Sequence, residues 1–392
     1  MGKLDFIEKE LQSLKERDQY RQIRWVEEGP SPWVRMNGTR VLLLCSNNYL
    51  GLASDPRLKE RAFQAIEEWG CGSGASRSIS GSLAIHRLLE ERLARFHGFE
   101  RALIFNSGYS ANLSILTALT GKEDVIFSDE LNHASIVDGC RLSKASVEVY
   151  RHLDMGHLES LLKKNQGKRR KLIVTDGIFS MDGDIAPLSE IAQLARKYEA
   201  LTMVDDAHAI GVFGPTGRGT LEHFRLPHEF DILMGTFGKA LGCFGAFVAG
   251  RRSLIEFLIN TGRVFLYTTA LPPSVSATVL ASLDLLDEEP ERRERLWKNV
   301  HYLREGLNHL GFDTMKSQAH IIPVLTGEPK ITMEMDRRLL ETGVFVQGIR
   351  PPTVPEGKCR LRVTVMATHT RKDLDFALEQ FEKVGKELGM IG

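Results

Sequence analysis

From about residue 100 the chain alternates short apolar runs with longer segments whose apolar residues recur at helical spacing. Runs of about four to eight residues bounded by polar residues predict buried strands, whereas a period near 3.6 predicts amphipathic helices. The strand-like runs are, in chain order, ALIF, DVIF, VEVY, KLIVTD, LTMVDD, DILMGTF and AFVAG. Because amphipathic segments such as LSEIAQLARKY separate several of them, the pattern predicts an α/β fold with a mostly parallel sheet flanked by helices.

The pattern changes at the charge-rich stretch LDLLDEEPERRERL, which contains the helix-disfavouring Pro290. After it, VHYLREGLNHL and KDLDFALEQFEKVGKEL read as helices, and HIIPVLTG, VFVQGIR and CRLRVTVMA read as strands. A smaller α+β domain is therefore expected. The expected division is an N-terminal helix and strand segment at 1–45, a large domain at 46–285 and a C-terminal α+β domain at 286–392.

Composition excludes several classes of protein. The 392 residues include 51 Lys plus Arg and 51 Asp plus Glu, so a formal net charge of +0 creates no global field that attracts nucleic acid or an anionic membrane. The opening MGKLDFIEKELQSLKER reads as an amphipathic helix rather than a signal peptide, and no apolar run of about 18 residues occurs. The five cysteines lack the spacing of a metal site. We expect a cytoplasmic protein without a bound metal.

Polar segments follow the strand-like runs at the point where each run ends. SGYSAN follows ALIF, SDELNHAS follows DVIF, DGIFSMDGD overlaps the end of KLIVTD, DDAH ends LTMV and GTFGK ends DILM. In open parallel sheets, ligands bind beyond the carboxyl ends of the strands. We therefore expect these segments to meet in one site.

Lys239 and Asp205 are the first chemical candidates of this site. Lys239 follows DILMGTF among small residues that let a planar ligand approach the backbone, although a lysine in such a string, taken alone, is most often a solvated surface residue. Asp205 ends LTMVD, where a buried carboxylate can pair with a protonated ring nitrogen; alone it reads as a helix cap or turn residue. The segment between them has room for one helix and one strand, so the two side chains can face each other across a pocket.

The segment FNSGYSAN combines a strand end, a glycine turn and a helix start. The N–H groups of Gly108 and Tyr109 can hold a phosphate there, and the Thr236 hydroxyl can donate to the same group. A plain strand-to-helix connection is an equally good reading of this segment taken alone.

Two further strand ends offer polar groups. His133 in SDELNHAS can stack on a flat ring, although a lone histidine is more often structural. Ser180 in GIFSMDGD can bond a cofactor, although a serine before Asp-Gly is also ordinary turn chemistry.

Together the segments SNNYLGL, GSGASRSISG, FNSGYSAN, DELNHAS, GIFSMDGD, VDDAHAIG, TFGKALG and YTTALPP resemble the α-oxoamine synthases, which are fold-type I pyridoxal-phosphate enzymes. The resemblance covers nearly the whole chain, with the motifs in matching order and spacing. It implies a large domain with a mostly parallel seven-stranded sheet flanked by helices, plus a smaller α+β C-terminal domain. It also implies pyridoxal 5'-phosphate as cofactor and a homodimer with shared active sites.

The resemblance implies a role for each matching residue. Lys239 holds the cofactor as a Schiff base and exchanges the substrate Cα proton, Asp205 pairs with the pyridinium nitrogen, and His208 bonds the phenolic oxygen. His133 stacks on the ring and contacts the substrate, and it counts with the other three as catalytic. The remaining expected cofactor contacts are Gly108, Tyr109, Ser180 and Thr236, together with Thr268 and Thr269, which reach the phosphate from a second subunit.

On the substrate side, Asn47 in SNNYLGL and Arg362 in CRLRVT resemble the amide and guanidinium that hold the amino-acid carboxylate. Arg21 and Thr353 resemble contacts to the acyl substrate, although Arg21 also reads as a surface helix arginine.

Within the family, IRPPTVPEGKCRLRVT and RVFLYTTALPP look most like the branch that condenses L-alanine with a pimeloyl thioester in biotin biosynthesis. This reaction, which gives 8-amino-7-oxononanoate, carbon dioxide and a free thiol, is the expected one, with coenzyme A or an acyl carrier protein as the carrier. The tail FEKVGKELGMIG looks more like the branch that joins glycine to acetyl-CoA. That reaction, and those of the 5-aminolevulinate and sphingoid-base synthases, remain alternatives.

Two other classes of function are weighed against this one. A catalytically silent partner subunit would keep the fold, but the presence of Lys239 argues against it. A nucleotide-binding protein would use GSGASRSISG as a phosphate loop. This segment lacks the Gly-Lys-Ser/Thr ending of a P-loop and follows the helix-like FQAIEEW instead of a strand, so it is disfavoured.

Overall fold

The computed structural model describes residues 2–226 and 228–392, and the chain forms two compact units. Unit 1 consists of Met1–Ser46, Met181–Gly183 and Glu294–Gly392, and unit 2 consists of Asn47–Ser180 and Asp184–Arg293.

This division differs from the one expected from the sequence in two main respects, and Ser46 and Met181–Gly183 of the expected large domain also belong to unit 1. The N-terminal segment belongs to the same unit as the C-terminal part, because strand β2 (Thr39–Leu43) pairs in parallel with β11 (Val344–Phe345). The boundary expected after residue 285 lies instead after Arg293. The charge-rich stretch before it is tied to unit 2, since Arg292 donates to the Asp55 carboxylate at 2.8 Å.

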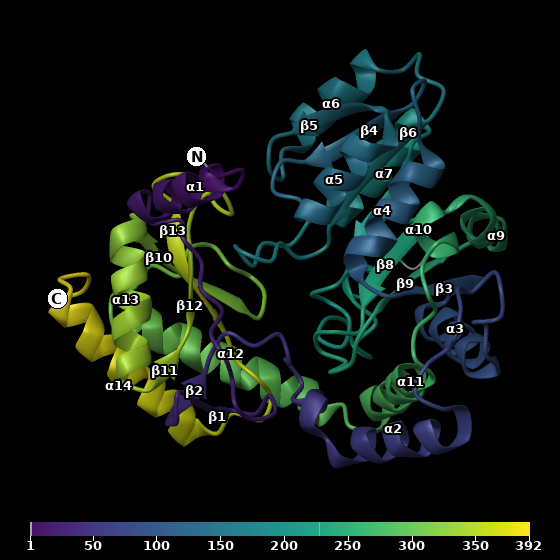
Figure 1. Ribbon diagram of the computed structural model, residues 1–392. Helices are drawn as coiled ribbons and strands as arrows, with labels where there is room; N and C mark the ends of the chain where they lie inside the picture. Colours follow the sequence, from purple (N-terminus) through teal and green to yellow (C-terminus); the bar gives the residue numbers. More distant parts are fainter. Residues whose placement is uncertain (1, 227) are drawn as a thin grey trace. The chain divides into compact units, whose positions relative to one another are not determined.

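Unit 2 contains the seven-stranded sheet, in the order β3-β9-β8-β7-β6-β4-β5 (Figure 1). Its strands are β3 (Arg101–Phe105), β4 (Val125–Asp129), β5 (Ser146–Tyr150), β6 (Lys171–Asp176), β7 (Leu201–Asp205), β8 (Ile232–Thr236) and β9 (Ala246–Gly250). The strands β5, β4, β6, β7 and β8 pair in parallel. The predicted mostly parallel sheet is confirmed.

Strand β9 runs antiparallel to both of its neighbours, β3 and β8. The chain between Thr236 and Ala246 contains no crossover helix. A return to a parallel neighbour needs a connection of about a dozen residues or more, so this short link permits only an antiparallel strand. The link carries Lys239, which therefore lies in a tight turn at the carboxyl end of β8.

Two helices of unit 2 that begin near the site or the unit boundary are capped by short polar side chains. Asp55 accepts from Arg57 N ahead of α2, with Pro56 at the first helical position, and Ser107 accepts from Ser110 N ahead of α4. The helices of unit 2 are η1 (Leu52–Ser54), α2 (Pro56–Trp69), α3 (Ala84–His97), α4 (Gly108–Leu119), α5 (Ala134–Ser143), α6 (Met155–Lys164), α7 (Leu188–Tyr198), α8 (Thr220–His223), α9 (Arg252–Thr261), α10 (Arg263–Leu266) and α11 (Pro273–Glu288).

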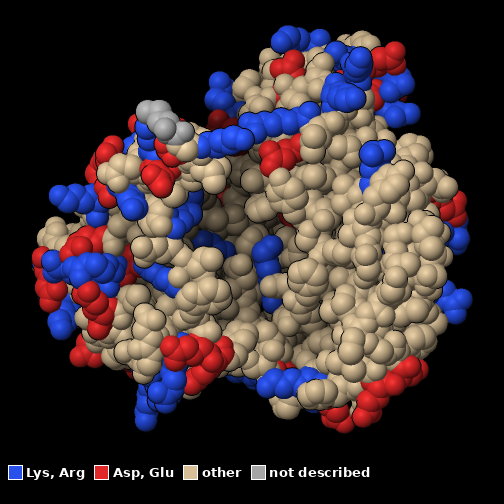
Figure 2. Space-filling view, viewed as in Figure 1, with Lys and Arg blue, Asp and Glu red and all other residues tan. Residues whose placement is uncertain are grey.

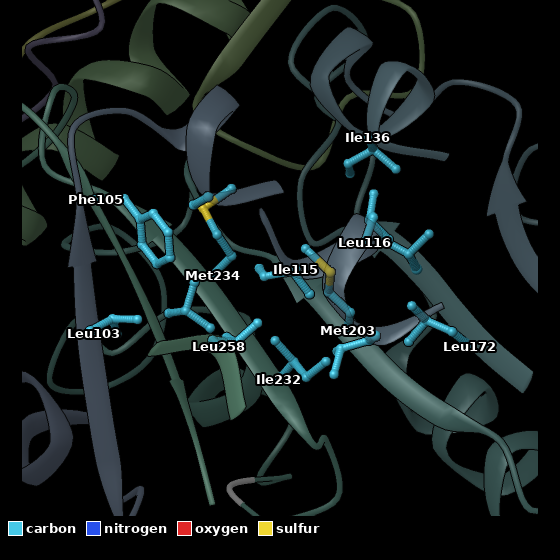
Figure 3. Packing of buried hydrophobic residues seen from close by; sticks show 14 of the residues in the cluster. Leu103, Phe105, Ile115, Leu116, Ile136, Leu172, Met203, Ile232, Met234 and Leu258 are labelled. Atoms are coloured by element: carbon cyan, nitrogen blue, oxygen red, sulfur yellow. The ribbon is translucent and has the colours of Figure 1, made fainter. Parts of the chain in front are cut away.

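The core of unit 2 lies between one face of the sheet and the helices α4, α5 and α9. Alternate strand residues such as Leu172 and Val174 of β6 contribute to it, and Ile115 and Leu116 of α4 pack against them (Figure 3). The intervening residue Ile173 is also buried, because both faces of a parallel sheet are covered. This explains why the strand-like runs are apolar throughout rather than alternating.

Unit 1 combines two three-stranded sheets, β1-β2-β11 and β10-β13-β12, with four helices. The α+β character expected for this part is confirmed. Besides β2 and β11, its elements are β1 (Trp33–Met36), β10 (Ile321–Gly327), β12 (Gln347–Ile349), β13 (Cys359–Thr364), α1 (Asp5–Glu16), α12 (Glu291–His309), α13 (Pro329–Glu341) and α14 (Arg371–Glu387).

The run VFVQGIR, expected as one strand, is divided between the two sheets of unit 1. Its first part is β11, which pairs with β2, and its second part is β12, which pairs with β13. Val346 lies between them and is fully buried. A period-2 pattern identifies extended chain but not its pairing partner, so the division is a property of the fold.

Among the helices formed by residues 2–226 and 228–392, none combines the length and the apolar character that crossing a bilayer requires.

Candidate active site

The carboxyl ends of β4, β6, β7 and β8 meet at a cavity of about 200 Å³ in unit 2. The prediction that several strand ends converge on one site is confirmed. The residues that line it are Gly108, Tyr109, His133, Ser135, Asp176, Ser180, Asp205, Ala207, His208, Met234, Thr236 and Lys239. Every cofactor contact that the sequence predicted within one subunit is among them.

Asp205 presents a buried carboxylate at the end of β7. Its Oδ2 accepts a hydrogen bond from Asn112 Nδ2 at 2.8 Å, and its Oδ1 accepts from Ala207 N at 3.0 Å. The two donors come from different segments and hold both carboxylate oxygens in place. The arrangement supplies a fixed negative charge to one side of the cavity.

Asn112 was not identified from the sequence. It lies on α4, one turn after Gly108, and its Nδ2 also donates to Ser135 Oγ at 2.8 Å. One amide thereby links the β7 carboxylate to α5. The spacing of four residues from Gly108, which puts both residues on the same helix face, was the signal available in FNSGYSAN.

The N-terminus of α4 forms a second wall of the cavity. The first N–H groups of a helix have no acceptor within the helix, and the Ser107 cap satisfies that of Ser110. Those of Gly108 and Tyr109 remain available to an anion, which the helix dipole also favours. A Cβ at Gly108 would lie 2.7 Å from Thr236 Cγ2, so only glycine lets the helix start approach β8 this closely.

His133 caps α5 and lines the opposite part of the cavity. Its Nδ1 accepts from Ser135 N at 3.3 Å and lies 2.7 Å from Ser135 Oγ, while its backbone N donates to Asp176 Oδ2 at 2.8 Å. Exclusion of water by the surrounding protein lowers the pKa of His133; the charge of Lys239 lowers it further, and Asp205 opposes the shift. The imidazole is therefore neutral at pH 7.

Asp176, at the end of β6, is a second buried carboxylate that the sequence reading did not single out. Burial raises the pKa of Asp176 well above its ordinary value, and the neighbouring charge of Asp205 raises it further. Two carboxyl groups this close do not both ionise readily. Burial and the charge of Asp205 therefore both oppose a second negative charge at Asp176.

His208 belongs to a chain of hydrogen bonds that enters from the start of unit 2. Its Nδ1 lies 2.8 Å from the Tyr49 hydroxyl, which in turn donates to Asn47 Oδ1 at 3.0 Å. The Tyr49 side chain is fully buried. Tyr49 was missed at the sequence level although SNNYLGL contains it, because the residues around a tyrosine do not indicate which distant group its hydroxyl bonds.

Ser180 and Lys239 reach the cavity from two turns. Ser180 follows β6 in a hairpin closed by the Ile178–Ile185 bridge. The turn of Lys239 is closed by a 2.9 Å bond from Gly242 N to Lys239 O. Gly242 has a positive φ, and a Cβ there would lie 2.3 Å from Ala53 N, so the turn packs closely against the chain at Ala53.

Unit 1 contains a larger cavity, of about 640 Å³, that brings Arg21 and Thr353 together. Arg21 Nη2 and Thr353 Oγ1 are 3.5 Å apart. Arg24 and Arg350 line the same cavity, and Arg24 pairs with the buried Asp336 at 2.6 Å. Three guanidinium groups line this cavity and, among the residues that the structure describes, only that of Arg24 is shown paired with a carboxylate, so the cavity is suited to an anion.

The remaining predicted residues lie elsewhere. Arg362 is a buried residue of β13 in unit 1, whereas Asn47 belongs to unit 2. Thr268 and Thr269 line a separate cavity of about 20 Å³ in unit 2, where Asn106 Nδ2 donates to Thr269 O at 2.9 Å. The structure does not bring these two threonines to the cavity of Lys239 in their own chain.

The segment GSGASRSISG follows helix α2 and not a strand. Its Arg77 forms a bidentate ion pair with Glu90, in which Nη1 donates to Oε1 at 2.8 Å and Nη2 donates to Oε2 at 3.1 Å. A Cβ at Gly81 would lie 2.0 Å from Ala75 O, so the loop folds tightly on itself. These contacts give the segment a structural role, which disfavours the nucleotide-binding alternative.

Comparisons with known proteins agree with this geometry. The family model for aminotransferase class I and II matches residues 39–381. The 8-amino-7-oxononanoate synthase of Geobacter sulfurreducens is 54% identical over 97% of this chain and 98% of its own length. The protein of the same name from Symbiobacterium thermophilum is 50% identical over the whole of both chains.

Solved structures match over similar lengths. The serine palmitoyltransferase of Sphingomonas wittichii superposes with a TM-score of 0.94 at 34% identity, covering 100% of this chain and 99% of its own. The 8-amino-7-oxononanoate synthase of Francisella tularensis superposes with a TM-score of 0.77 at 30% identity, covering 88% of this chain and 98% of its own. The expected fold type is thereby confirmed, and the chain belongs to the aminotransferase class I and II family of pyridoxal-phosphate enzymes and, within it, to the α-oxoamine synthases.

Proposed function

We propose that this chain catalyses the condensation of L-alanine with a pimeloyl thioester, with loss of carbon dioxide, to give 8-amino-7-oxononanoate and a free thiol in biotin biosynthesis. The observation that carries the proposal is the identity of 54% over 97% of the chain to a relative named for this product. The serine palmitoyltransferase with the same fold is only 34% identical. The residues at the strand ends supply the chemical groups that the reaction needs.

The residues of the Lys239 cavity fit pyridoxal 5'-phosphate. The helix start at Gly108 and Tyr109, with the hydroxyls of Thr236 and Ser180, would hold the phosphate and the ring substituents. The Asp205 carboxylate would pair with the ring nitrogen. When bound, the cofactor withdraws electrons from the substrate and makes its Cα–H acidic.

Asn112 and Ala207 N keep Asp205 in one position by occupying both of its oxygens. A fixed carboxylate needs no reorganisation when positive charge is placed beside it. Burial and the charge of Asp205, which raise the pKa of Asp176, oppose a second negative charge beside it. The neutral His133 presents an uncharged ring to the cavity, which suits it to stack on a heterocycle without repelling a cation.

Lys239 is the proposed covalent anchor of the cofactor and the base of the reaction. Its Nζ takes the Cα proton of the amino acid and later returns a proton to the product. His208 would bond the phenolic oxygen through the nitrogen that does not face Tyr49, and the Tyr49–Asn47 chain would hold that ring in place.

The substrate carboxylate is assigned to Asn47 and Arg362, and the acyl group to Arg21 and Thr353. Arg362 is buried, so an anion bound to it would be desolvated and held strongly. The guanidinium groups in the 640 Å³ cavity can bind the phosphates of a coenzyme A carrier, and they can also bind negative charge on the acyl chain itself. An acetyl group has no such charge, whereas a pimeloyl chain ends in a carboxylate.

We also propose that the enzyme is a homodimer in which Thr268 and Thr269 serve the partner's phosphate site. These threonines lie away from the Lys239 cavity of their own chain. Unit 2 exposes large apolar side chains, including Ile79 at 80% and Tyr267 at 75%. Figure 2 shows a broad area without charged side chains over the part of unit 2 that carries α10 and β3. Burial of such a surface is typical of a stable dimer interface.

The test is an absorbance titration of the purified enzyme with L-alanine and with glycine, followed by pimeloyl-CoA, a pimeloyl acyl carrier protein or acetyl-CoA. Products are identified by mass spectrometry. We expect a cofactor band that responds to L-alanine, and 8-amino-7-oxononanoate only when a pimeloyl donor is added.

Each other outcome has a defined meaning. Turnover of glycine with acetyl-CoA alone would move the chain to the branch that its C-terminal tail resembles. The better of the two pimeloyl donors identifies the carrier. A protein without any cofactor band would contradict the assignment of Lys239.

A further inference from the structure

His152 lies outside the Lys239 cavity but bridges two carboxylates that hold one of its walls. Its Nδ1 is 2.9 Å from Asp129 Oδ1, and its Nε2 is 3.2 Å from Asp184 Oδ2. The His152 side chain is 17% exposed and that of Asp129 is 1% exposed. Two carboxylate acceptors on opposite nitrogens require both nitrogens to carry protons, which is the imidazolium form.

Asp184 belongs to residues 177–186, here called the Ser180 hairpin. The hairpin is closed by Ala186 N to Gly177 O and by Phe179 N to Asp184 O, both at 3.0 Å. Ser180, at its tip, lines the Lys239 cavity. The buried ring of Phe179 meets the His152 ring edge to face, with the ring centroids 4.4 Å apart. His152 therefore contacts the hairpin on both sides of Ser180.

Asp129 fixes the other end of the bridge to the sheet. It is the last residue of β4, and its carboxylate also accepts from Leu131 N at 2.9 Å and Leu153 N at 3.0 Å. A carboxylate held by two backbone donors does not move with the hairpin. The ion pair thus connects the Ser180 hairpin to the end of strand β4.

The other charged groups near the His152 bridge have hydrogen-bond or ion-pair partners of their own. The Glu130 carboxylate accepts from His152 N at 2.8 Å, and Arg151 pairs with Asp154 at the surface. Asp182, in the same hairpin, is paired with Arg360. The charge of Asp129 also contributes to the raised pKa of the nearby Asp176, after burial and the charge of Asp205.

We propose that His152 is a positioning residue that, as an imidazolium bridging Asp129 and Asp184, holds the Ser180 hairpin in the conformation that places Ser180 on the cofactor. This inference rests on the proposed role of Ser180 in the cofactor site. Burial alone would lower the pKa of His152, but the bonds to the two carboxylates outweigh it and raise the pKa to about 9. The bridge is thus intact at neutral pH and opens under alkaline conditions.

The experiment titrates the apo-enzyme with pyridoxal phosphate from about pH 7 to pH 10.5 and measures kcat at saturating cofactor. For His152→Gln, which removes the charge and keeps one donor, we expect about tenfold weaker cofactor binding at neutral pH and no step in affinity near pH 9. For Asp184→Asn, which keeps an acceptor but removes its charge, the step moves down by about one pH unit. The value of kcat at saturating cofactor changes less than about twofold, since His152 touches no reacting atom.

His309→Gln is the matched control, because His309 is exposed on α12 and bonds only the Glu305 carbonyl of its own helix. It should leave the affinity and its pH profile unchanged. Ser180→Ala separates positioning from general loosening. If His152 acts through Ser180, the double variant His152→Gln with Ser180→Ala binds the cofactor no more weakly than Ser180→Ala alone.

Wild-type affinity and an unchanged pH profile in His152→Gln would overturn the proposal, as would strictly additive losses in the double variant. If His152→Gln does not fold, as judged by circular dichroism, the Asp184→Asn profile decides instead. The affinity measurements, which decide the proposal, use the cofactor alone, so they are independent of which amino acid and acyl donor the enzyme accepts.

Discussion

At the scale of single residues, the site depends on which hydrogen-bond donors and which charges surround a few buried polar groups. Asp205 and Asp176 are chemically identical side chains at the ends of adjacent strands, and their surroundings divide the roles between them. Asp205 receives Asn112 and Ala207 N, whereas burial and the nearby charge raise the pKa of Asp176. The side chain that decides which carboxylate can serve a cationic ring is therefore Asn112.

Asn112→Ala should weaken pyridoxal phosphate binding about tenfold and lower the free energy of unfolding by about 1–3 kcal/mol. The physical reason is that the Asp205 carboxylate and the Ser135 hydroxyl both lose a buried donor. Cofactor titration and urea unfolding measure the two effects. Thr117→Ala on the same helix is the control, because its hydroxyl bonds only Leu113 O. Unchanged cofactor affinity in Asn112→Ala would contradict this account of Asp205.

At the scale of elements, the close approach of α4 to β8 and the anchoring of the Ser180 hairpin shape the cavity. The helix start can lie against β8 only because residue 108 has no side chain. The hairpin follows β6 and is held laterally by His152. Both features set the positions of hydroxyl and N–H groups rather than adding buried apolar area.

Gly108→Ala should reduce cofactor affinity by about tenfold or more, because its new Cβ would meet Thr236 Cγ2 at 2.7 Å and force α4 away from β8. The combination with Thr236→Ser removes that methyl group and keeps the hydroxyl. We expect the double variant to bind the cofactor more tightly than Gly108→Ala alone. Failure of this rescue, measured by the same titration, would show that the methyl contact is not what requires glycine.

His152 should also give the folded protein a pH-dependent stability. Its pKa of about 9 in the folded protein lies above the ordinary value near 6.5, so its contribution is fully present below about pH 6.5 and is lost as the pH rises through 9. The stability difference between wild type and His152→Gln should therefore shrink, by on the order of 2 kcal/mol, from pH 6 to pH 10. Urea unfolding of the apo-protein at several pH values measures it. A constant difference would exclude a titrating bridge.

At the scale of the whole molecule, the predicted site residues are divided between the two units. Unit 2 holds every predicted cofactor residue of the Lys239 cavity, and unit 1 holds Arg21, Thr353 and Arg362. The N-terminal residues contribute to unit 1 through β2, although they are far in sequence from its C-terminal strands. Truncation at either end of the chain therefore affects the same unit.

Mixed dimers test the proposed exchange of Thr268 and Thr269 between subunits. A Lys239→Ala chain and a chain with both threonines changed to alanine should each be nearly inactive alone. Co-refolding equal amounts should restore roughly a quarter of the wild-type activity, because half of the dimers then contain one intact site of two. No restoration, with dimers confirmed by native mass spectrometry, would place the threonines in the site of their own chain.

The pattern of apolar and polar residues by itself determined the main sheet and the location of the candidate site. Apolar runs separated by amphipathic segments predicted the parallel sheet, because a sheet covered on both faces demands apolar residues at consecutive positions. The strand ends predicted where Lys239, Asp205, His133 and Ser180 would meet, because parallel strands end at a common edge. The position of these residues at one site was thus predictable from their place at the strand ends, without knowledge of any contact between side chains.

Only the tertiary structure decided the remainder. The antiparallel β9, the pairing of β2 with β11 and the division of VFVQGIR depend on partners distant in sequence. The same holds for Asn112, Tyr49 and His152, whose importance comes from the groups they meet. Periodicity indicates which face of an element is buried. A hydrogen bond between elements requires that the donor and acceptor be placed to within a few tenths of an ångström, and the linear pattern does not encode that placement.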